Sequence, residues 1–133
     1  MLRLFLSILA AIALASCSAG GLLLDASTTT MDVATADKAA KSARLTYVGL
    51  LNLANVYAAR PRCGQPTSPV LCSEQEVVNA LRKADTAADA ATSALENGVR
   101  SLGSSPTVLA ALAKGADASL SAWRQIVATY RVN

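Results

Sequence analysis

The chain has 133 residues, twelve lysines and arginines against nine aspartates and glutamates, a net charge of +3 and no histidine. The lack of histidine excludes Ser-His-Asp and Cys-His catalytic arrangements. The nearly balanced charge, without a basic run interleaved with aromatic residues, argues against nucleic-acid binding. We therefore expect one modest domain that is not an enzyme and that needs no cofactor or metal.

Residues 1–16 have the composition of a secretory signal peptide. Arg3 supplies a small positive region, residues 4–15 form an almost uninterrupted apolar run, and small residues follow. The apolar run is shorter than the roughly 20 residues that a membrane-spanning helix needs. An uncleaved anchor over residues 4–24 is the alternative, but two glycines inside it would each cost about 1 kcal/mol relative to alanine in a helix.

The segment LASC at residues 14–17 resembles the lipobox of bacterial lipoproteins. The resemblance implies that Cys17 is acylated on its sulfur, that the chain is cleaved before it, and that the new amine is acylated as well. Several acyl chains hold a protein firmly on a bilayer, whereas one holds it only marginally. Because Ser18 rather than an acidic residue follows, the resemblance favours the periplasmic face of the outer membrane over the inner membrane. The anchor also explains the odd count of three cysteines.

Residues 17–30 are interpreted as the lipidated N-terminus and a tether. The stretch GGLLLDASTTT has no sustained hydrophobic period and ends in β-branched residues. Fully extended, this segment of about a dozen residues reaches about 40 Å. The folded domain, expected over residues 31–133, could therefore stand away from the bilayer.

A first helix is predicted over residues 31–60. Its apolar positions recur every three or four residues, and Pro61 disfavours helical geometry at the residue before it. Acidic residues in the early turns and Arg60 in the last turn suit the helix dipole. The predicted buried face contains Ala36, Ala40, Ala43, Tyr47, Leu50, Ala54 and Tyr57, and is widened by Leu45, Val48 and Leu51.

The connection that follows contains Cys63 and Cys72. In an exported chain two cysteines that bracket a proline-containing loop are expected to form a disulfide. Closing this ring of ten residues would stabilise the fold by about 2.7 kcal/mol in the chain-entropy model. Zinc binding and redox chemistry are the alternatives, but zinc needs four ligands and a redox pair more often has the spacing Cys-x-x-Cys.

Two further helices are predicted over residues 74–102 and 106–131. Ser73 and Glu76 have the spacing of a capping box at the start of the first, and Gly103 is its expected stop signal. Ser105 and Pro106 have the pattern of a cap followed by proline at the first helical position. The apolar positions are Val77, Leu81, Ala84, Ala88, Ala91, Leu95 and Leu102, then Leu109, Leu112, Ala116, Leu120, Trp123, Val127 and Tyr130. Gly115 could mark a kink or a close backbone contact.

These elements predict an all-α fold, a three-helix antiparallel bundle with a disulfide in the loop between helices 1 and 2. Its many alanines imply closely spaced helices and a thin core. Acidic pairs at Glu74 and Glu76 and at Asp85 and Asp89 are assigned to helix surfaces rather than to catalysis. The stretch over residues 55–85 is similar to small lipoproteins of alphaproteobacteria and their prophages.

Two basic groups are candidate contact sites. Lys38, Lys41 and Arg44 recur at threes near the membrane end of the first helix and could touch anionic headgroups, at about 1 kcal/mol each. Arg60 and Arg62 flank the disulfide loop and could contact a partner. A solvated helix face and a plain structural turn are the respective alternatives.

The sequence thus predicts a non-enzymatic lipoprotein of the cell envelope, held on the membrane by its lipid. It would act through contacts with an envelope protein or with peptidoglycan, and its oligomeric state is left open. A periplasmic ligand-binding or inhibitory module is one alternative. A phage-encoded lysis or exclusion lipoprotein is another, which the similarity to prophage lipoproteins implies.

Overall fold

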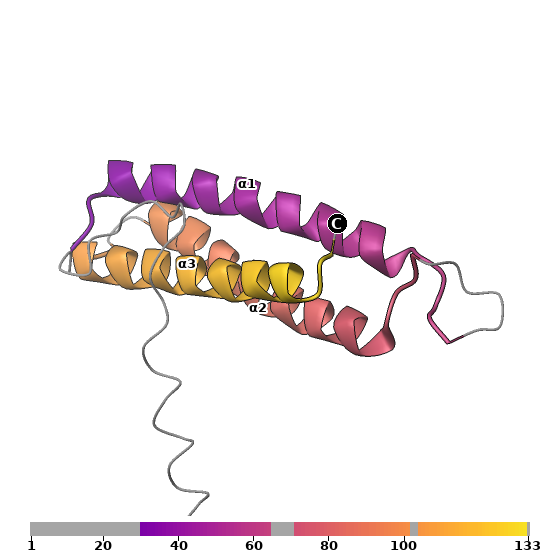
Figure 1. The fold of residues 1–133 in the computed structure, drawn as a ribbon. Coiled ribbons are helices and arrows are strands. Elements are labelled where there is room, and N and C mark those ends of the chain that lie inside the picture. Colours follow the sequence, from indigo (N-terminus) through magenta and orange to yellow (C-terminus); the bar gives the residue numbers. More distant parts are fainter. Residues whose placement is uncertain (1–29, 65–70, 102–103, 133) are drawn as a thin grey trace, which may run out of the picture.

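The computed structural model describes residues 30–64, 71–101 and 104–132. Within these residues the chain forms three α-helices, α1 (Val33–Ala58), α2 (Gln75–Arg100) and α3 (Pro106–Thr129). α1 and α3 run in the same direction and α2 runs against both, so that the bundle is antiparallel in chain order (Figure 1). The predicted fold class is confirmed, and each helix lies within two residues of its predicted bounds.

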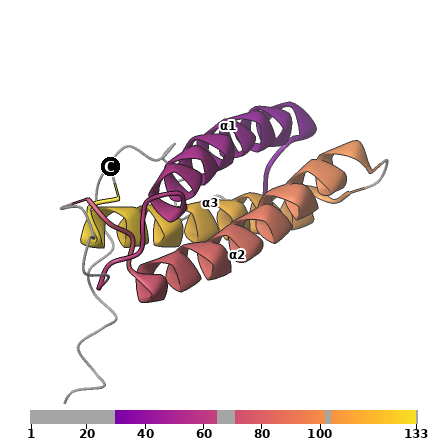
Figure 2. The same ribbon diagram turned by 90° about the vertical axis from the view of Figure 1, so that its right-hand side faces the viewer.

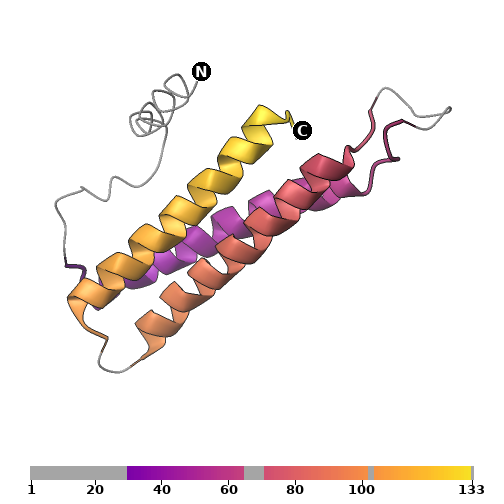
Figure 3. The ribbon, with the colours of Figure 1, turned by 90° about the horizontal axis from the view of Figure 1, so that it is seen from below.

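α1 packs along one side of the α2–α3 pair, and each helix contacts the other two (Figures 2 and 3). The side of α1 that points away from α2 and α3 is therefore left open to solvent. The α1 end at Val33 lies beside the start of α3, whereas the α1 end at Ala58 leads into the connection to α2 (Figure 1). The two ends of α1 thus have different neighbours.

Capping side chains start α1 and α3. Asp32 precedes α1 and accepts hydrogen bonds from the backbone N–H (2.9 Å) and the hydroxyl (2.7 Å) of Thr35, which lower the pKa of its carboxyl. Ser105 caps α3 by accepting a bond from the backbone N–H of Val108, with Pro106 at the first helical position, as predicted.

The buried side chains form two clusters along the bundle. The cluster towards the α1–α2 connection contains the aromatic side chains of Tyr57 and Trp123, and Trp123 is fully buried. The other is rich in alanine and contains Met31, Ala36, Ala40, Leu95, Leu109, Ala113 and Ala116. Trp123 is therefore a core residue, as expected.

Gly98 lies against α3, whereas Gly115 does not meet a neighbouring helix. A Cβ added at Gly98 would lie 2.5 Å from Cδ1 of Leu112 on α3, so that a larger residue at this position would require the Leu112 side chain to move. A Cβ at Gly115 would meet nothing within 4 Å, and α3 continues through that position. Gly103, the expected stop signal, lies outside the described residues.

The end of α3 returns the chain to the core. Arg131 has a φ of 47°, in the left-handed region. The backbone N–H of Val132 then donates to the carbonyl of Val127 (3.0 Å), and Val132 is fully buried. Tyr130, which the periodicity assigns to the apolar face, is instead 42% exposed. α3 ends at Thr129 and the chain turns back at Arg131, so that the Tyr130 side chain does not pack on the buried face of the helix.

The predicted capping box at α2 is wrong. α2 begins after Glu74, whose side chain makes no capping bond, and Ser73 is fully buried. The Ser73 hydroxyl donates to the carbonyl oxygen of Arg60 (3.0 Å), and its backbone N–H donates to the carbonyl of Pro61 (2.8 Å). Ser73 therefore ties the end of α1 to the start of α2, and its hydroxyl is unavailable for capping.

Replacing Ser73 with alanine is expected to lower the free energy of unfolding by about 1–3 kcal/mol, because a buried carbonyl loses its donor. Glu76→Ala, which would break a capping box equally well, is the matched control and is expected to cost at most about 0.5 kcal/mol through the helix dipole. Urea unfolding followed by circular dichroism measures both. Equal losses in the two variants would contradict the assignment.

Candidate functional site

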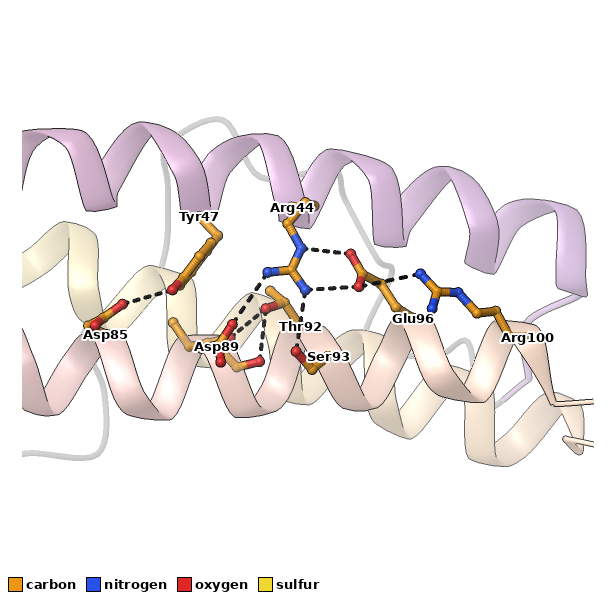
Figure 4. Close-up of polar contacts among 9 residues, drawn as sticks. Arg44, Tyr47, Asp85, Asp89, Thr92, Ser93, Glu96 and Arg100 are labelled. Carbon is orange, nitrogen blue, oxygen red and sulfur yellow. Dashed lines mark hydrogen bonds and ion pairs between the residues drawn. The ribbon is translucent and has the colours of Figure 1, made fainter.

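The strongest polar arrangement in the described residues lies between α1 and α2. Arg44 on α1 donates from Nε to Oε1 of Glu96 (2.7 Å) and from Nη2 to Oε2 (2.8 Å), a bidentate pair (Figure 4). Its Nη1 reaches Oδ1 of Asp89 at 3.4 Å, and its Nη2 reaches the hydroxyl of Ser93 at 3.3 Å. One guanidinium thus bonds to side chains on three turns of α2.

Tyr47 extends this arrangement towards the core. Its hydroxyl donates to Oδ1 of Asp85 (2.9 Å), and its ring lies edge-on to Trp123 with centroids 5.7 Å apart. The guanidinium of Arg44 lies 5.3 Å from the centre of the same ring. Burial, followed by the hydrogen bond to Asp85, raises the pKa of Tyr47 to about 12. We call these residues, Arg44, Tyr47, Asp85, Asp89, Ser93 and Glu96, the α1–α2 polar cluster.

Lys38, Lys41 and Arg44, the first candidate contact group, differ in their surroundings. The Arg44 side chain is 32% exposed and is bonded across the helix interface. Lys41 pairs with Asp37 one turn earlier, and Lys38 is exposed. Asp85 and Asp89, assigned to a helix surface in the sequence, are partly buried and exposed, respectively, and both also accept hydrogen bonds from α1.

The polar cluster lowers the pKa of Glu96 and raises that of Arg44. For Glu96 the hydrogen bonds from Arg44 are the main cause, and partial burial opposes them. Because the carboxyl's pKa is lower in the folded state than in the unfolded chain, the pair stabilises the fold above the ordinary pKa of 4.5. The stabilisation is lost as the pH falls through the folded-state pKa.

Replacing Arg44 with methionine is expected to lower the free energy of unfolding by about 1–2 kcal/mol at neutral pH, since the carboxylate of Glu96 loses its bidentate partner. In a double-mutant cycle with Glu96→Gln, the coupling energy is expected to be about 1 kcal/mol. The difference between wild type and Arg44→Met should shrink as the pH falls below about 4.5.

Lys41→Met is the control, because its exposed pair with Asp37 is expected to contribute at most about 0.5 kcal/mol. Urea unfolding at several pH values measures all four variants. An equal loss in Lys41→Met, or a difference that stays constant into acid, would contradict the role assigned to Arg44.

The connection between α1 and α2 is held covalently, as predicted. Cys63 and Cys72 form a disulfide with Cα atoms 5.0 Å apart. Beside it, the backbone N–H of Cys63 donates to the carbonyl of Ser73 (3.2 Å), and the backbone N–H of Glu74 donates to the hydroxyl of Tyr57 (3.1 Å). The disulfide and these hydrogen bonds all join the end of α1 to the start of α2, so that several independent interactions fix the position of α2 against α1.

The structure places Arg60 and Arg62 at this junction, where the sequence put them. Both are partly exposed, and the guanidinium of Arg60 lies 5.3 Å from the centre of the Tyr57 ring. Leu71, next to the disulfide, is 68% exposed. The periodicity gave no indication of this exposed apolar side chain, because it lies outside every helix.

The outer face of α1 is a second surface that the sequence pattern misassigned. Leu45 and Val48, predicted to widen the buried face, are 76% and 45% exposed, whereas Leu51 is partly buried. These two side chains share the side of α1 opposite Ala36, Ala40 and Ala54. We define the outer face of α1 as Leu45, Val48, Gly49, Asn52, Leu53 and Val56, all of which are exposed.

A surface groove runs between α1 and the end of α2 and has a volume of about 500 Å³. Its lining combines apolar residues with paired charges, namely Asp37, Ala40, Lys41, Arg44, Leu45, Glu96, Val99 and Arg100. Over residues 30–64, 71–101 and 104–132 no group of three or more potential ligand side chains is placed to hold a metal ion. In the same ranges no helix is both long and apolar enough to cross a membrane.

Comparison with protein families, with curated protein sequences and with solved structures gives no match for this chain. The lipid-attachment residue proposed from the sequence, Cys17, lies outside the described residues.

Proposed function

We propose that the protein is a non-enzymatic lipoprotein of the cell envelope, anchored to a membrane through Cys17. The observation that carries the proposal is the lipobox-like segment at residues 14–17, placed directly after an apolar run with a positive start. The following Ser18 favours the outer membrane. The bundle would then be held on the periplasmic side by the tether that ends at residue 30.

The way the chain enters the bundle suits a tethered domain. Met31 is 4% exposed, and its backbone N–H donates to the carbonyl of Pro106 (2.9 Å) at the start of α3. The junction between tether and bundle is therefore fixed at one end of the molecule. A lipid at Cys17 would hold this end within about 40 Å of the bilayer.

We further propose that the protein acts through contacts with an envelope protein or with peptidoglycan. The connection closed by the Cys63–Cys72 disulfide offers a surface for such a contact, because its described residues include the exposed Leu71 and the partly exposed Arg60 and Arg62. Arginine is enriched among the residues that contribute most to binding at protein interfaces. The disulfide and the backbone bonds of Ser73 hold the described ends of this connection together, which lowers the conformational entropy that these residues would lose on binding.

Mass spectrometry of the protein purified from its host membrane tests the anchor. We expect a chain that begins at residue 17 and carries acyl groups on Cys17. Cys17→Ala should move the protein out of the membrane fraction, whereas Ser18→Ala should leave it there. An intact N-terminal methionine, or an unmodified Cys17, would show that the protein is not a lipoprotein.

Cross-linking in intact cells tests the contact surface. A photo-reactive amino acid at Leu71 is expected to give a discrete adduct with one envelope protein or with peptidoglycan fragments. The same group at Thr86, an exposed position on α2, is the control. If the two positions gave the same adducts, or Leu71 gave none, the connection would not be the contact surface.

A ligand-binding module is the second candidate, and the groove lined by Ala40, Leu45 and Val99 favours it. Its volume of about 500 Å³ lies within the usual range for small-molecule sites. However, the charges around it pair with one another, Lys41 with Asp37 and Arg44 with Glu96. A polar ligand would have to compete with these pairs, so that contact through the exposed surfaces is the better-supported function.

A further inference from the structure

We propose that the outer face of α1 lies on the surface of the phospholipid bilayer that carries the lipid anchor. This inference rests on the proposed anchor at Cys17 and adds an orientation to it. The outer face, defined above, has four large apolar side chains that are 41–76% exposed: Leu45, Val48, Leu53 and Val56. None of the four belongs to either buried cluster of the bundle, and Leu45 also borders the groove between α1 and α2.

The charge pattern of α1 suits a membrane surface. From Leu45 to Ala59 the sequence contains no charged residue, although most helix surfaces in water carry several. The exposed positions of α2, by contrast, include Glu76, Arg82, Lys83, Asp89 and Arg100. An exposed, uncharged helix side with bulky aliphatic side chains is the part of this molecule that an apolar interface would stabilise most.

The position of the tether favours the bilayer as the surface that the outer face of α1 contacts. The tether joins the bundle immediately before α1, and its reach of about 40 Å matches the length of this 26-residue helix, about 39 Å. Every point of the outer face therefore stays within reach of the anchoring membrane. Tethering converts a weak surface affinity into high occupancy, because the effective concentration of the bilayer is high.

A second copy of the chain fits the same face less well. Lys38 and Lys41 lie on the outer side of α1 before the uncharged stretch, and Arg60 and Arg62 follow it. Two copies paired through this face would bring positively charged side chains together, whether the helices ran parallel or antiparallel. On a bilayer the same lysines can extend to lipid phosphates while their aliphatic stems lie along the apolar surface.

Spin-label accessibility on the full lipidated chain in vesicles of phosphatidylethanolamine and phosphatidylglycerol tests this orientation. Leu45→Cys and Val56→Cys place a nitroxide on the outer face, and Thr86→Cys places one on the exposed side of α2 as the matched control. Cys63 and Cys72 are disulfide-bonded and Cys17 would be acylated, so that the introduced thiol is the one labelled. We expect several-fold more collisions with oxygen and fewer with a water-soluble nickel complex at positions 45 and 56 than at 86.

Equal accessibility at all three positions would overturn the proposal. Protection of positions 45 and 56 from both reagents would overturn it as well, because the face would then be covered by a protein or a second copy. The mass spectrum of the same samples reports acylation of Cys17 separately. An acylated chain with a water-exposed outer face contradicts this inference alone, whereas an unacylated chain that does not float with the vesicles contradicts the proposed function too.

Discussion

The close packing of helices through alanine is the constraint on which the rest of this structure depends. At the end where the chain enters, Ala36 and Ala40 of α1 share a buried cluster with Ala113 and Ala116 of α3, so that more than half of its buried residues are alanines. Small side chains allow the helix axes to approach, but each removes little apolar area from water, at about 25 cal/mol per Å². The fold therefore needs stabilisation from elsewhere. The disulfide, the Ser73 bonds at the junction and the return of Val132 to the core supply part of it.

Alanine faces also specify register poorly, because sliding one such helix along another changes the packing little. The Arg44–Glu96 pair supplies a specific contact that holds α1 and α2 in one register. Both side chains are partly buried and bond in a bidentate geometry. A shift of α1 by one turn would separate them and leave a partly buried charge without its partner, which costs more than the pair itself contributes. Tyr47 and Asp85 repeat the same restraint further along the helices. The α1–α2 polar cluster thus fixes which turns of α1 and α2 meet.

The sequence predicts the bounds of the helices well, but it predicts less well which side chains are buried and which of them meet between the helices. Periodicity, Pro61 and the pair Ser105–Pro106 act locally, so that helix bounds and the cap of α3 follow from neighbouring residues. The sequence pattern wrongly predicts Ser73 as a helix cap, because the partner of its hydroxyl, the carbonyl of Arg60, lies thirteen residues earlier. Periodicity predicts that Leu45 and Val48 are buried, because it indicates the width of an apolar stripe but not how much of that stripe a neighbouring helix covers. The polar residues Asp85, Asp89, Ser93 and Glu96 do recur on one side of α2. Their relation to Arg44, however, depends on a register that only the folded chain defines.

The proposed orientation on the bilayer changes what the disulfide-held connection can reach. With the outer face of α1 on the membrane, the helix axis lies along the surface and both of its ends are at similar height. The connection that follows α1, with Arg60 and Leu71, would then lie near the membrane surface. Of the two partners proposed for that connection, this orientation favours a neighbouring membrane protein over peptidoglycan. Peptidoglycan, in contrast, would meet the exposed sides of α2 and α3, where charged side chains such as Arg82 and Lys114 are found. The tether is long enough for the bundle either to lie on the bilayer or to stand away from it, and the exposed apolar side chains of α1 favour the first arrangement. The orientation of this one helix would therefore determine which class of envelope component each surface can contact.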